Sequence, residues 1–374
     1  MIPYGRQSIN QDDIDSVVEV LRSDYLTQGK KVSEFEENLA RYCGSKYAVA
    51  VSNGTAALHT AFNVIGLKEG DEFITSPLTF VATSNAGFWQ GAKPVFVDID
   101  LDTGNIDVDK IEENITSKTK AIVPVDYTGR PVDLDRIREI ANKHNLSVIE
   151  DACQALGAAY KGSKIGSISD LTVFSFHPVK NITTGEGGAI LTNSVEYYKK
   201  MKRFITHGIT KEGLDEKLGP WYFDMVDLGV NYRLTDMSCA LGVSQLKRLD
   251  SFVEKRFEIA KRYNKAFKDF GNIITPKLDT DDIQSAWHLY VIRLKKGVSE
   301  KRLEIFKKLR ESGVGVHVHH IPVHMHNYYK NLGYSSVGLE NAEDFYNSII
   351  SLPLYPDLSL EDQDFVIDSI KNII

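Results

Sequence analysis

The feature that most constrains this chain is a regular alternation of short apolar runs and helix-like segments over its first two thirds. Near-continuous apolar runs between helices are typical of strands in a parallel sheet that helices cover on both faces. We therefore expect the α/β fold class. The predicted strands are Tyr47–Val51, EFITS, KPVFVDID, KAIVPV, LSVIED, LTVFSF and GGAILT, and the predicted helices are TAALHTAFNVIGL and the segments near Thr79–Gln90, Val108–Asn114, Leu134–His144 and Ser194–Thr206.

The pattern changes in the last third of the chain. A long helical stretch from about Asp236 to Phe270 leads into elements that no longer alternate regularly, which favours a smaller α+β domain beginning near Ser251. We therefore predict one domain over residues 1–250, with an N-terminal helix at Gln11–Ser23, and a second over residues 251–374. The second part should contain the strands WHLYVIRL and VGVHVHHIP, the helix SEKRLEIFKKLRES and closing helices near Glu340–Ile350 and Glu361–Ile374.

The composition restricts the kinds of partner. The chain is 42% hydrophobic and carries a formal net charge of −7, so it has no overall field that would gather nucleic acid. No apolar run approaches the ~18 residues of a membrane span, and the first residues lack the basic and apolar regions of a secretory signal. The widely spaced Cys43, Cys153 and Cys239 suit reduced thiols. We expect a cytoplasmic protein with neither nucleic-acid nor membrane partners.

The segment Ser52-Asn53-Gly54-Thr55 joins a predicted buried strand to a predicted helix. The free N–H groups and dipole of a helix N-terminus attract anions, glycine lets the backbone approach a ligand closely, and Thr55 adds a hydroxyl. The segment is therefore a candidate anion site, and a plain helix cap explains it as well. It contains no G-x-G-x-x-G fingerprint, so a dinucleotide site is not supported.

Asp151 stands at the carboxyl end of the predicted strand LSVIED, where open α/β sheets bind their ligands. A carboxylate in that crevice can pair with a ring nitrogen and keep it protonated. Gln154, three residues further on, would reach the same ligand. Taken alone, Asp151 is better explained by a helix N-cap.

Lys180 lies in a loop directly after the strand LTVFSF, so it can reach the same crevice. A lysine held near pyridoxal phosphate (PLP) forms a Schiff base, and such an environment favours its neutral amine. Ser175, five residues earlier, can donate to a phosphate, and Thr183–Gly188 supplies a tight turn. A single lysine is more often a surface residue. If Lys180 were only a surface lysine, its position close to a candidate phosphate site and to an aspartate at a strand end would be a coincidence.

Five motifs follow one another along nearly the whole chain: SNGTAAL, SPLTFVATSNA, EDACQALGA, FSFHPVKNITTGEGG and GVNYRLTDMSCALG. In this order they resemble the DegT/StrS-type nucleotide-sugar aminotransferases, which are PLP enzymes of fold type I. The resemblance implies a large domain with a mostly parallel seven-stranded sheet between helices and a smaller α+β C-terminal domain. It also implies PLP as the cofactor and a homodimer with shared active sites.

The resemblance assigns roles to the residues around the cofactor. Lys180 would be the Schiff-base lysine, and Asp151 would pair with the pyridine nitrogen. The other implied contacts are Gln154 to the phenolic oxygen, Gly54, Thr55 and Ser175 to the phosphate, Phe80 stacked on the ring, and Asn231 to the phosphate from the other subunit. One branch of the family replaces the lysine by histidine and performs dehydration, so Lys180 favours transamination.

The substrate side is marked by two segments with weaker signals. Tyr25–Lys30 resembles the family's substrate loop, which makes Thr27 and Lys30 candidates, with a plain turn as the alternative. Arg233 is a candidate phosphate contact because a guanidinium group matches phosphate oxygens. A surface arginine is the alternative there.

A cluster of histidines near the C-terminus gives a further candidate, His317. On a strand, His317 and His319 would share a face and His320 would point away. No carboxylate or thiolate stands near them in the sequence, so we expect no metal site. In the family this stretch approaches the nucleotide sugar, so His317 is expected to contact substrate.

The expected activity is transfer of an amino group from L-glutamate to a 4-keto-6-deoxy nucleotide sugar, with Lys180 moving the proton as general base and acid. The opening MIPYGRQSI and the lysine motif look most like the family branch of pseudaminic acid biosynthesis. Its substrate is UDP-2-acetamido-2,6-dideoxy-β-L-arabino-hexos-4-ulose, and its products are UDP-4-amino-4,6-dideoxy-N-acetyl-β-L-altrosamine and 2-oxoglutarate. The alternatives are another sugar 4-aminotransferase (bacillosamine/legionaminic type or perosamine), a nicotinamide-dependent sugar oxidoreductase, and a non-catalytic regulator on the same fold.

Overall fold

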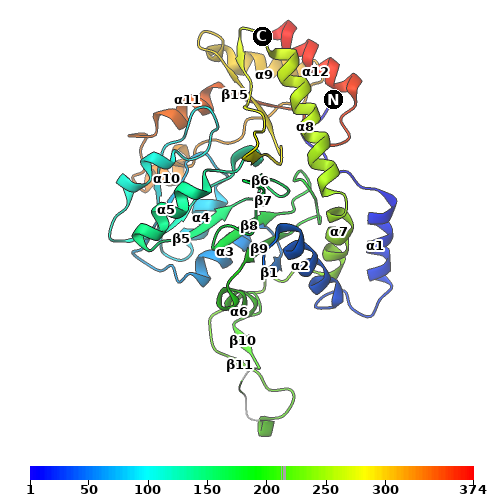
Figure 1. Ribbon diagram of the computed structural model, residues 1–374, viewed down its shortest axis with the longest axis vertical. Coiled ribbons are helices and arrows are strands. Elements are labelled where there is room, and N and C mark those ends of the chain that lie inside the picture. Colours follow the sequence, from blue (N-terminus) through cyan, green and yellow to red (C-terminus); the bar gives the residue numbers. More distant parts are fainter. Residues whose placement is uncertain (212, 214–215) are drawn as a thin grey trace.

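The computed structural model describes residues 1–374 except 212, 214 and 215. A seven-stranded sheet with the order β1-β9-β8-β5-β4-β2-β3 lies between helices (Figure 1). Its strands are β1 (Tyr47–Val51), β2 (Glu72–Thr75), β3 (Lys93–Phe96), β4 (Thr119–Val123), β5 (Ser147–Asp151), β8 (Leu171–Ser175) and β9 (Gly188–Thr192). Four of the neighbouring pairs are parallel, and only β9 runs antiparallel to its neighbours β1 and β8. The predicted mostly parallel sheet is confirmed.

Both faces of this sheet are buried. In β1, Ala48 and Ala50 belong to the core on one face, whereas Val49 and Val51 belong to the core on the other. The first face is covered by α2 (Lys30–Cys43), α5 (Leu134–His144) and α7 (Asp236–Leu246), and the second by α3 (Gly54–Val64), α4 (Ala82–Phe88) and α6 (Val195–Phe204). Burial on both faces explains why the strands appear as continuous apolar runs.

A second, three-stranded antiparallel sheet lies at the upper end of Figure 1. It consists of β12 (Ile273–Ile274), β14 (Tyr290–Leu294) and β15 (Ile349–Leu352), and it packs with α8 (Leu249–Phe267), α9 (Arg302–Glu311) and α12 (Leu360–Ile373). Helix α8 joins the two parts, because Phe252 lies in the core of the large sheet and Tyr263 in that of the small one. The domain boundary that we predicted near Ser251 falls within α8, and the division stays a prediction.

The remaining elements are peripheral. They are α1 (Gln11–Leu21), β6 (Ala159–Tyr160), β7 (Ser163–Lys164), β10 (Ile209–Thr210), β11 (Asp224–Met225), β13 (Ile283–Gln284), α10 (Asn327–Asn331) and α11 (Glu340–Ser348). The hairpin of β10 and β11 extends away from the rest of the chain at the lower end of Figure 1. Among the described helices, none combines the length and apolar character that a membrane crossing requires.

Two predicted helices differ from the structure. The segment near Val108–Asn114 forms two short 3₁₀ turns with hydrogen bonds between residues three apart, such as that from Lys110 N to Asp107 O. The long helix from Asp236 is interrupted after Leu246, where Arg248 N donates to Gln245 O instead of continuing the α-helical ladder.

The C-terminal part differs as well. The segment VGVHVHHIP forms only isolated bridges, from Val314 to Ile2 and from His317 to Ser351, and not a strand. The helix predicted near Glu340–Ile350 stops at Ser348, and the apolar run that follows it is β15. A short apolar run after a helix can be the end of that helix or a separate strand, and periodicity alone could not distinguish the two.

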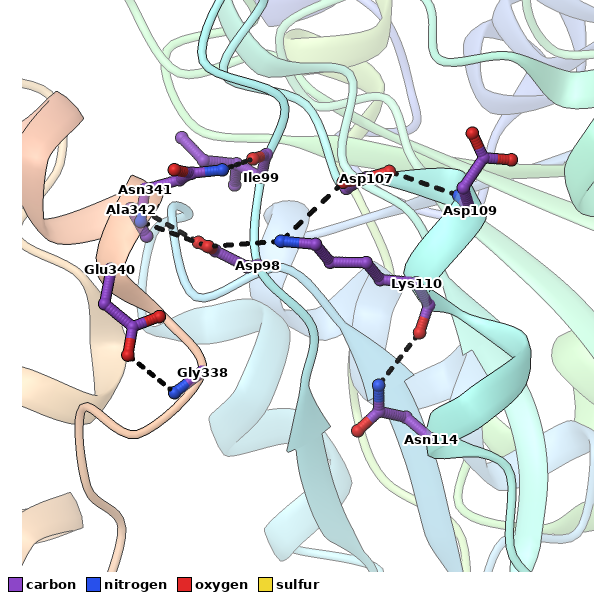
Figure 2. Close-up of polar contacts among 10 residues, drawn as sticks. All are labelled: Asp98, Ile99, Asp107, Asp109, Lys110, Asn114, Gly338, Glu340, Asn341 and Ala342. Atoms are coloured by element: carbon purple, nitrogen blue, oxygen red, sulfur yellow. Dashed lines mark hydrogen bonds and ion pairs between the residues drawn. The ribbon is translucent and has the colours of Figure 1, made fainter.

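A buried carboxylate connects the large sheet to α11. Asp98, which follows β3 and is 2% exposed, accepts hydrogen bonds from Asn341 N at 3.0 Å and Ala342 N at 2.9 Å, as Figure 2 shows. The amine of Lys110 lies 3.7 Å from the same carboxylate, and the Lys110 side chain is 41% exposed. The two N–H groups belong to the first turn of α11, where a negative charge is favourable. Asp98 therefore fixes the start of α11 on the large sheet.

We predict that Asp98→Asn lowers the free energy of unfolding by about 1–3 kcal/mol, because an amide cannot accept from both backbone N–H groups in the same way. The control Lys110→Met should cost less than about 1 kcal/mol, since the Lys110 amine lies 3.7 Å from the carboxylate, beyond hydrogen-bond distance, and is partly open to solvent. Urea unfolding of both variants measures the difference. Equal losses in the two variants would show that the helix cap is not the stabilising contact.

Candidate active site

The carboxyl ends of three strands converge in one crevice. Because β1 and β8 both run antiparallel to β9, and β5 runs parallel to β8, the three strands point the same way. The loops after them touch: a Cβ atom added to Gly54 would lie 3.0 Å from Ser175 Cβ and 3.2 Å from Cys153 Sγ. This is the edge at which open α/β sheets bind ligands.

The start of α3 has the form of an anion cradle. The Asn53 side chain accepts from Ala56 N at 2.7 Å, and the first intrahelical bond comes from Ala57 N. The N–H groups of Gly54 and Thr55 precede that bond, so the helix itself cannot satisfy them. The hydroxyl-bearing Thr55 and Ser175 are both half-buried. The residues predicted to hold a phosphate therefore lie together at a helix N-terminus, and any side chain at position 54 would crowd the space between them.

The Asp151 carboxylate is held in place at the end of β5. Its Oδ2 accepts from the Thr83 hydroxyl at 2.6 Å, and its Oδ1 accepts from Cys153 N at 3.2 Å. Thr83 also lies 2.8 Å from the Thr79 hydroxyl. Asp151 is only 5% exposed, so its carboxylate is confined to one direction. The residue does not cap a helix, because the chain after it forms a turn and the hairpin of β6 and β7.

Lys180 lies in a braced loop between β8 and β9. The Thr183 hydroxyl donates to Phe176 O at 3.0 Å, and Asn181 Nδ2 donates to Ala286 O at 2.6 Å. The loop also closes on itself through Lys180 N, which donates to His177 O at 2.8 Å. Burial lowers the pKa of the Lys180 amine, against smaller opposing effects of the neighbouring Cys153 and Asp151. The environment thus favours the neutral amine that proton transfer requires.

Gln154 faces the same crevice from the segment after Asp151. Its Oε1 accepts from Thr128 N at 2.8 Å, and its Nε2 lies 3.3 Å from His320 Nε2. The Phe80 ring is 59% exposed, and its centroid lies 6.0 Å from that of His320. This large exposed ring beside His320 is suited to stacking on a flat ligand.

Three histidines lie within electrostatic reach of Lys180: the buried His288 and His319, and the half-buried His320. Burial is the largest cause that lowers the pKa of His288 well below its usual value, that of His319 to about 2 and that of His320 to about 3. The positive charge of Lys180 acts in the same direction on all three. These imidazoles are therefore neutral at pH 7, and they add no positive charge to the crevice.

His317 lies beside this group but is exposed. Its ring stacks on that of His319 with centroids 4.4 Å apart, so the two share a face as predicted, and the Tyr4 ring lies 5.3 Å away. The expectation that His320 points away was wrong, because without a strand ladder its ring turns toward His319 and Gln154. Among the described residues, no three His, Cys, Asp or Glu side chains are grouped to hold a metal ion.

The other predicted substrate residues form a second group. Thr27 bridges Thr235 through the backbone, and Lys30 is the exposed first residue of α2. Arg233 bridges Val51, the last residue of β1, so the group adjoins the anion cradle. Within the described part of the chain, the buried Arg233 Nε has no hydrogen-bond partner. The exposed Asn231 lies two residues earlier, with its backbone bridged to Thr206.

Sequence reasoning missed several groups that position the site. Thr83 was seen only inside a family motif, although it binds Asp151 across 68 positions of sequence. The Thr128 N–H and the buried His288 were also missed. A backbone donor leaves no mark in the sequence, and a lone histidine before a strand carries no sign of its neighbours. His320 could have been found only as a member of the histidine cluster.

Comparison with known proteins assigns the chain to a class of enzymes. Residues 7–371 match the DegT/DnrJ/EryC1/StrS aminotransferase family, so the chain belongs to this family and is an aminotransferase. The resemblance seen in the sequence motifs is confirmed. The nicotinamide-dependent oxidoreductase that we considered is thereby contradicted.

Individual members of the family are similar to the chain over its whole length. The chain is 44% identical over 377 residues to the UDP-4-amino-4,6-dideoxy-N-acetyl-β-L-altrosamine transaminase of Campylobacter jejuni, covering 100% of this chain and 98% of the relative. Its fold matches Helicobacter pylori PseC, an aminotransferase of pseudaminic acid biosynthesis, with a TM-score of 0.94, 36% identity and coverage of 100% and 98%. It also matches the PLP form of the putative sugar aminotransferase Spr1654 from Streptococcus pneumoniae, with a TM-score of 0.94, 34% identity and the same coverage.

Proposed function

We propose that this chain is a PLP-dependent aminotransferase that converts UDP-2-acetamido-2,6-dideoxy-β-L-arabino-hexos-4-ulose and L-glutamate to UDP-4-amino-4,6-dideoxy-N-acetyl-β-L-altrosamine and 2-oxoglutarate. The observation that carries the proposal is the convergence of Lys180, Asp151 and the Gly54–Ser175 cradle in one crevice. The names of the relatives in Campylobacter jejuni and Helicobacter pylori support the sugar and the pathway. L-glutamate as donor is what the family resemblance implies.

The residues present fit PLP. The helix N-terminus with the Gly54 and Thr55 N–H groups and the Ser175 hydroxyl would hold its phosphate, because phosphate suits such a cradle. Asp151 would face the ring nitrogen, and the exposed Phe80 would cover the ring. When bound, PLP supplies the electron sink that stabilises the carbanion of the amino donor.

The chain's own groups would carry the proton and hold the charges. Asp151, held in place by its two hydrogen bonds, would pair with the ring nitrogen and keep it protonated. Lys180, whose neutral amine is favoured by burial, takes the proton from the α-carbon of glutamate as general base and returns one to the sugar C4 as general acid. Arg233 and His317 would contact the nucleotide sugar, together with Thr27 and Lys30.

A substrate panel tests the sugar assignment. Purified protein supplied with PLP and L-glutamate is offered 4-keto-6-deoxy UDP-, dTDP- and GDP-sugars, and 2-oxoglutarate release is measured. We expect the UDP-linked 2-acetamido sugar to give the highest kcat/KM. Preference for a GDP-sugar would instead support a perosamine-type enzyme, and preference for a UDP-sugar of the opposite C5 configuration would support a bacillosamine-type enzyme.

We also propose that the protein acts as a homodimer with shared active sites, in the cytoplasm as its unpaired cysteines suggest. A set of large apolar side chains is exposed on the arm formed by residues 216–228, and exposed apolar clusters mark interaction surfaces. These side chains are Leu218, Trp221, Phe223, Met225, Val226 and Leu228. Asn231 follows this arm directly, which supports its reaching the partner's cofactor phosphate.

Subunit mixing tests this arrangement. Lys180→Ala and Asn231→Asp chains should each be inactive, because the first lacks the amine and the second places a carboxylate against the phosphate. Mixed in equal amounts and re-paired at random, half the dimers carry one fully intact site, so activity should return to roughly a quarter of the wild-type level. Confirmed subunit exchange with no recovery would show that Asn231 does not act in the partner's site.

A further inference from the structure

The Gln154 side chain is held at both of its ends. Thr128 N, a backbone donor, lies 2.8 Å from Gln154 Oε1, and His320 Nε2 lies 3.3 Å from Gln154 Nε2. The amide is 6% exposed and belongs to a segment that starts at Asp151. A glutamine amide has one acceptor end and one donor end, so these two contacts can be satisfied together in only one orientation.

We propose that His320 is a positioning residue that fixes the orientation of the Gln154 amide, so that its second N–H always faces the crevice. The inference rests on the proposed function, in which that N–H donates to the phenolic oxygen of PLP. With Thr128 alone, the amide would be held only at its oxygen, and turning about the Cγ–Cδ bond could move its N–H groups away from the crevice. The imidazole acceptor removes this freedom, because it binds one N–H and leaves the other on the opposite side of the amide nitrogen.

The surroundings of His320 suit it to accept. A neutral imidazole has one donor and one acceptor nitrogen, so Nε2 accepts only if the proton is on Nδ1. Burial, together with the charges of Lys180 and His317, lowers the pKa of His320 to about 3, so the ring is neutral at pH 7. Its edge-to-face contact with His319, with centroids 5.2 Å apart, limits rotation of the ring.

Absorbance titration of the bound cofactor gives a readout that a merely structural role would not move. An N–H donated to the phenolic oxygen withdraws negative charge from it. When that N–H is lost, the more negative oxygen should hold the proton on the neighbouring Lys180 nitrogen more tightly. We expect His320→Leu to raise the pH midpoint of the visible absorbance change by roughly 0.5–1 unit. His320→Gln, whose Oε1 can accept in place of Nε2, should keep the midpoint close to that of the wild type.

Two further variants show whether His320 acts on the cofactor through Gln154 or directly. Gln154→Leu should shift the midpoint at least as far as His320→Leu, and the double variant should shift it no further, because both changes remove the same contact. Fully additive shifts would show that His320 acts on the cofactor directly and would overturn the inference. His324→Asn is the matched control, since His324 is a buried histidine of the same segment that pairs with Glu343 at 3.0 Å. Its midpoint should stay at the wild-type value.

Nitrogen-15 NMR of the histidine rings in the wild-type holoenzyme provides a measurement that needs no variant. We expect His320 to show a protonated Nδ1 and an unprotonated Nε2 at pH 7. A protonated Nε2, or unshifted midpoints in both His320→Leu and Gln154→Leu, would overturn the inference. Failure of the proposed function is distinguishable, because wild-type protein incubated with PLP and then separated from free PLP by gel filtration would show no visible band.

Discussion

Lys180→Ala is expected to reduce turnover by ~10⁴-fold or more, since a positioned general acid–base group alone contributes up to ~10⁴-fold. The variant removes the amine whose pKa is lowered by burial beside Asp151. The neighbouring Asn181 cannot replace it, because its side-chain amide donates to Ala286 O. The measurement is 2-oxoglutarate release from L-glutamate and the UDP-linked ketosugar.

The fold of the Lys180→Ala variant should stay intact, because the loop is held by the Thr183 hydroxyl and the Asn181 amide rather than by the amine. An unchanged thermal midpoint checks this. Lys164→Ala is a suitable control, because Lys164 is a lysine of the same part of the chain that pairs with Asp250 at 3.1 Å. It should retain turnover. Wild-type turnover in the folded Lys180→Ala variant would exclude Lys180 as the proton carrier.

Asp151→Asn should reduce kcat/KM by ~10²–10³-fold, the typical cost of losing one electrostatic contact in an active site. An amide cannot hold a ring nitrogen protonated as a carboxylate does. The variant should still bind PLP, because the phosphate cradle at Gly54 does not depend on it. Near-wild-type kcat/KM in the purified variant would show that Asp151 has only a structural role.

The Thr83 hydroxyl provides a graded control for this prediction. Thr83→Val removes the donor that lies 2.6 Å from Asp151 Oδ2, whereas Thr83→Ser retains it. We expect a loss of roughly tenfold in the first variant, in line with one hydrogen bond to a charged group, and little change in the second. Equal losses in both would point to packing of the threonine methyl group instead.

The central sheet could be predicted from the sequence because each of its strands is recognisable from its own residues. Burial on both faces makes its strands continuous apolar runs. The bounds of β1 and α5 are those that the sequence indicates, and β5 begins one residue later than predicted. Helix α2 was missed although its buried Phe35, Leu39 and Cys43 recur every four residues, so that signal was present and unused.

The C-terminal part was harder to predict because its pairing is non-local. Whether the residues around His317 form a strand depends on where Ile2 and Ser351 lie, and those positions are set by the folded chain. For the candidate site, motifs identify the residues that would touch a cofactor. The groups that orient them, Thr83 and His320, come from segments 68 and 166 positions away, so only the folded structure brings them together.

Borohydride reduction followed by peptide mass mapping tests the central claim most directly. The claim is that the crevice at the ends of β1, β5 and β8 carries PLP on Lys180. Reduction of wild-type protein loaded with PLP should fix the cofactor to the single peptide that contains Lys180, and Lys180→Ala should yield no labelled peptide. Label on any other lysine, or no label on protein that retains PLP through gel filtration, would contradict the account.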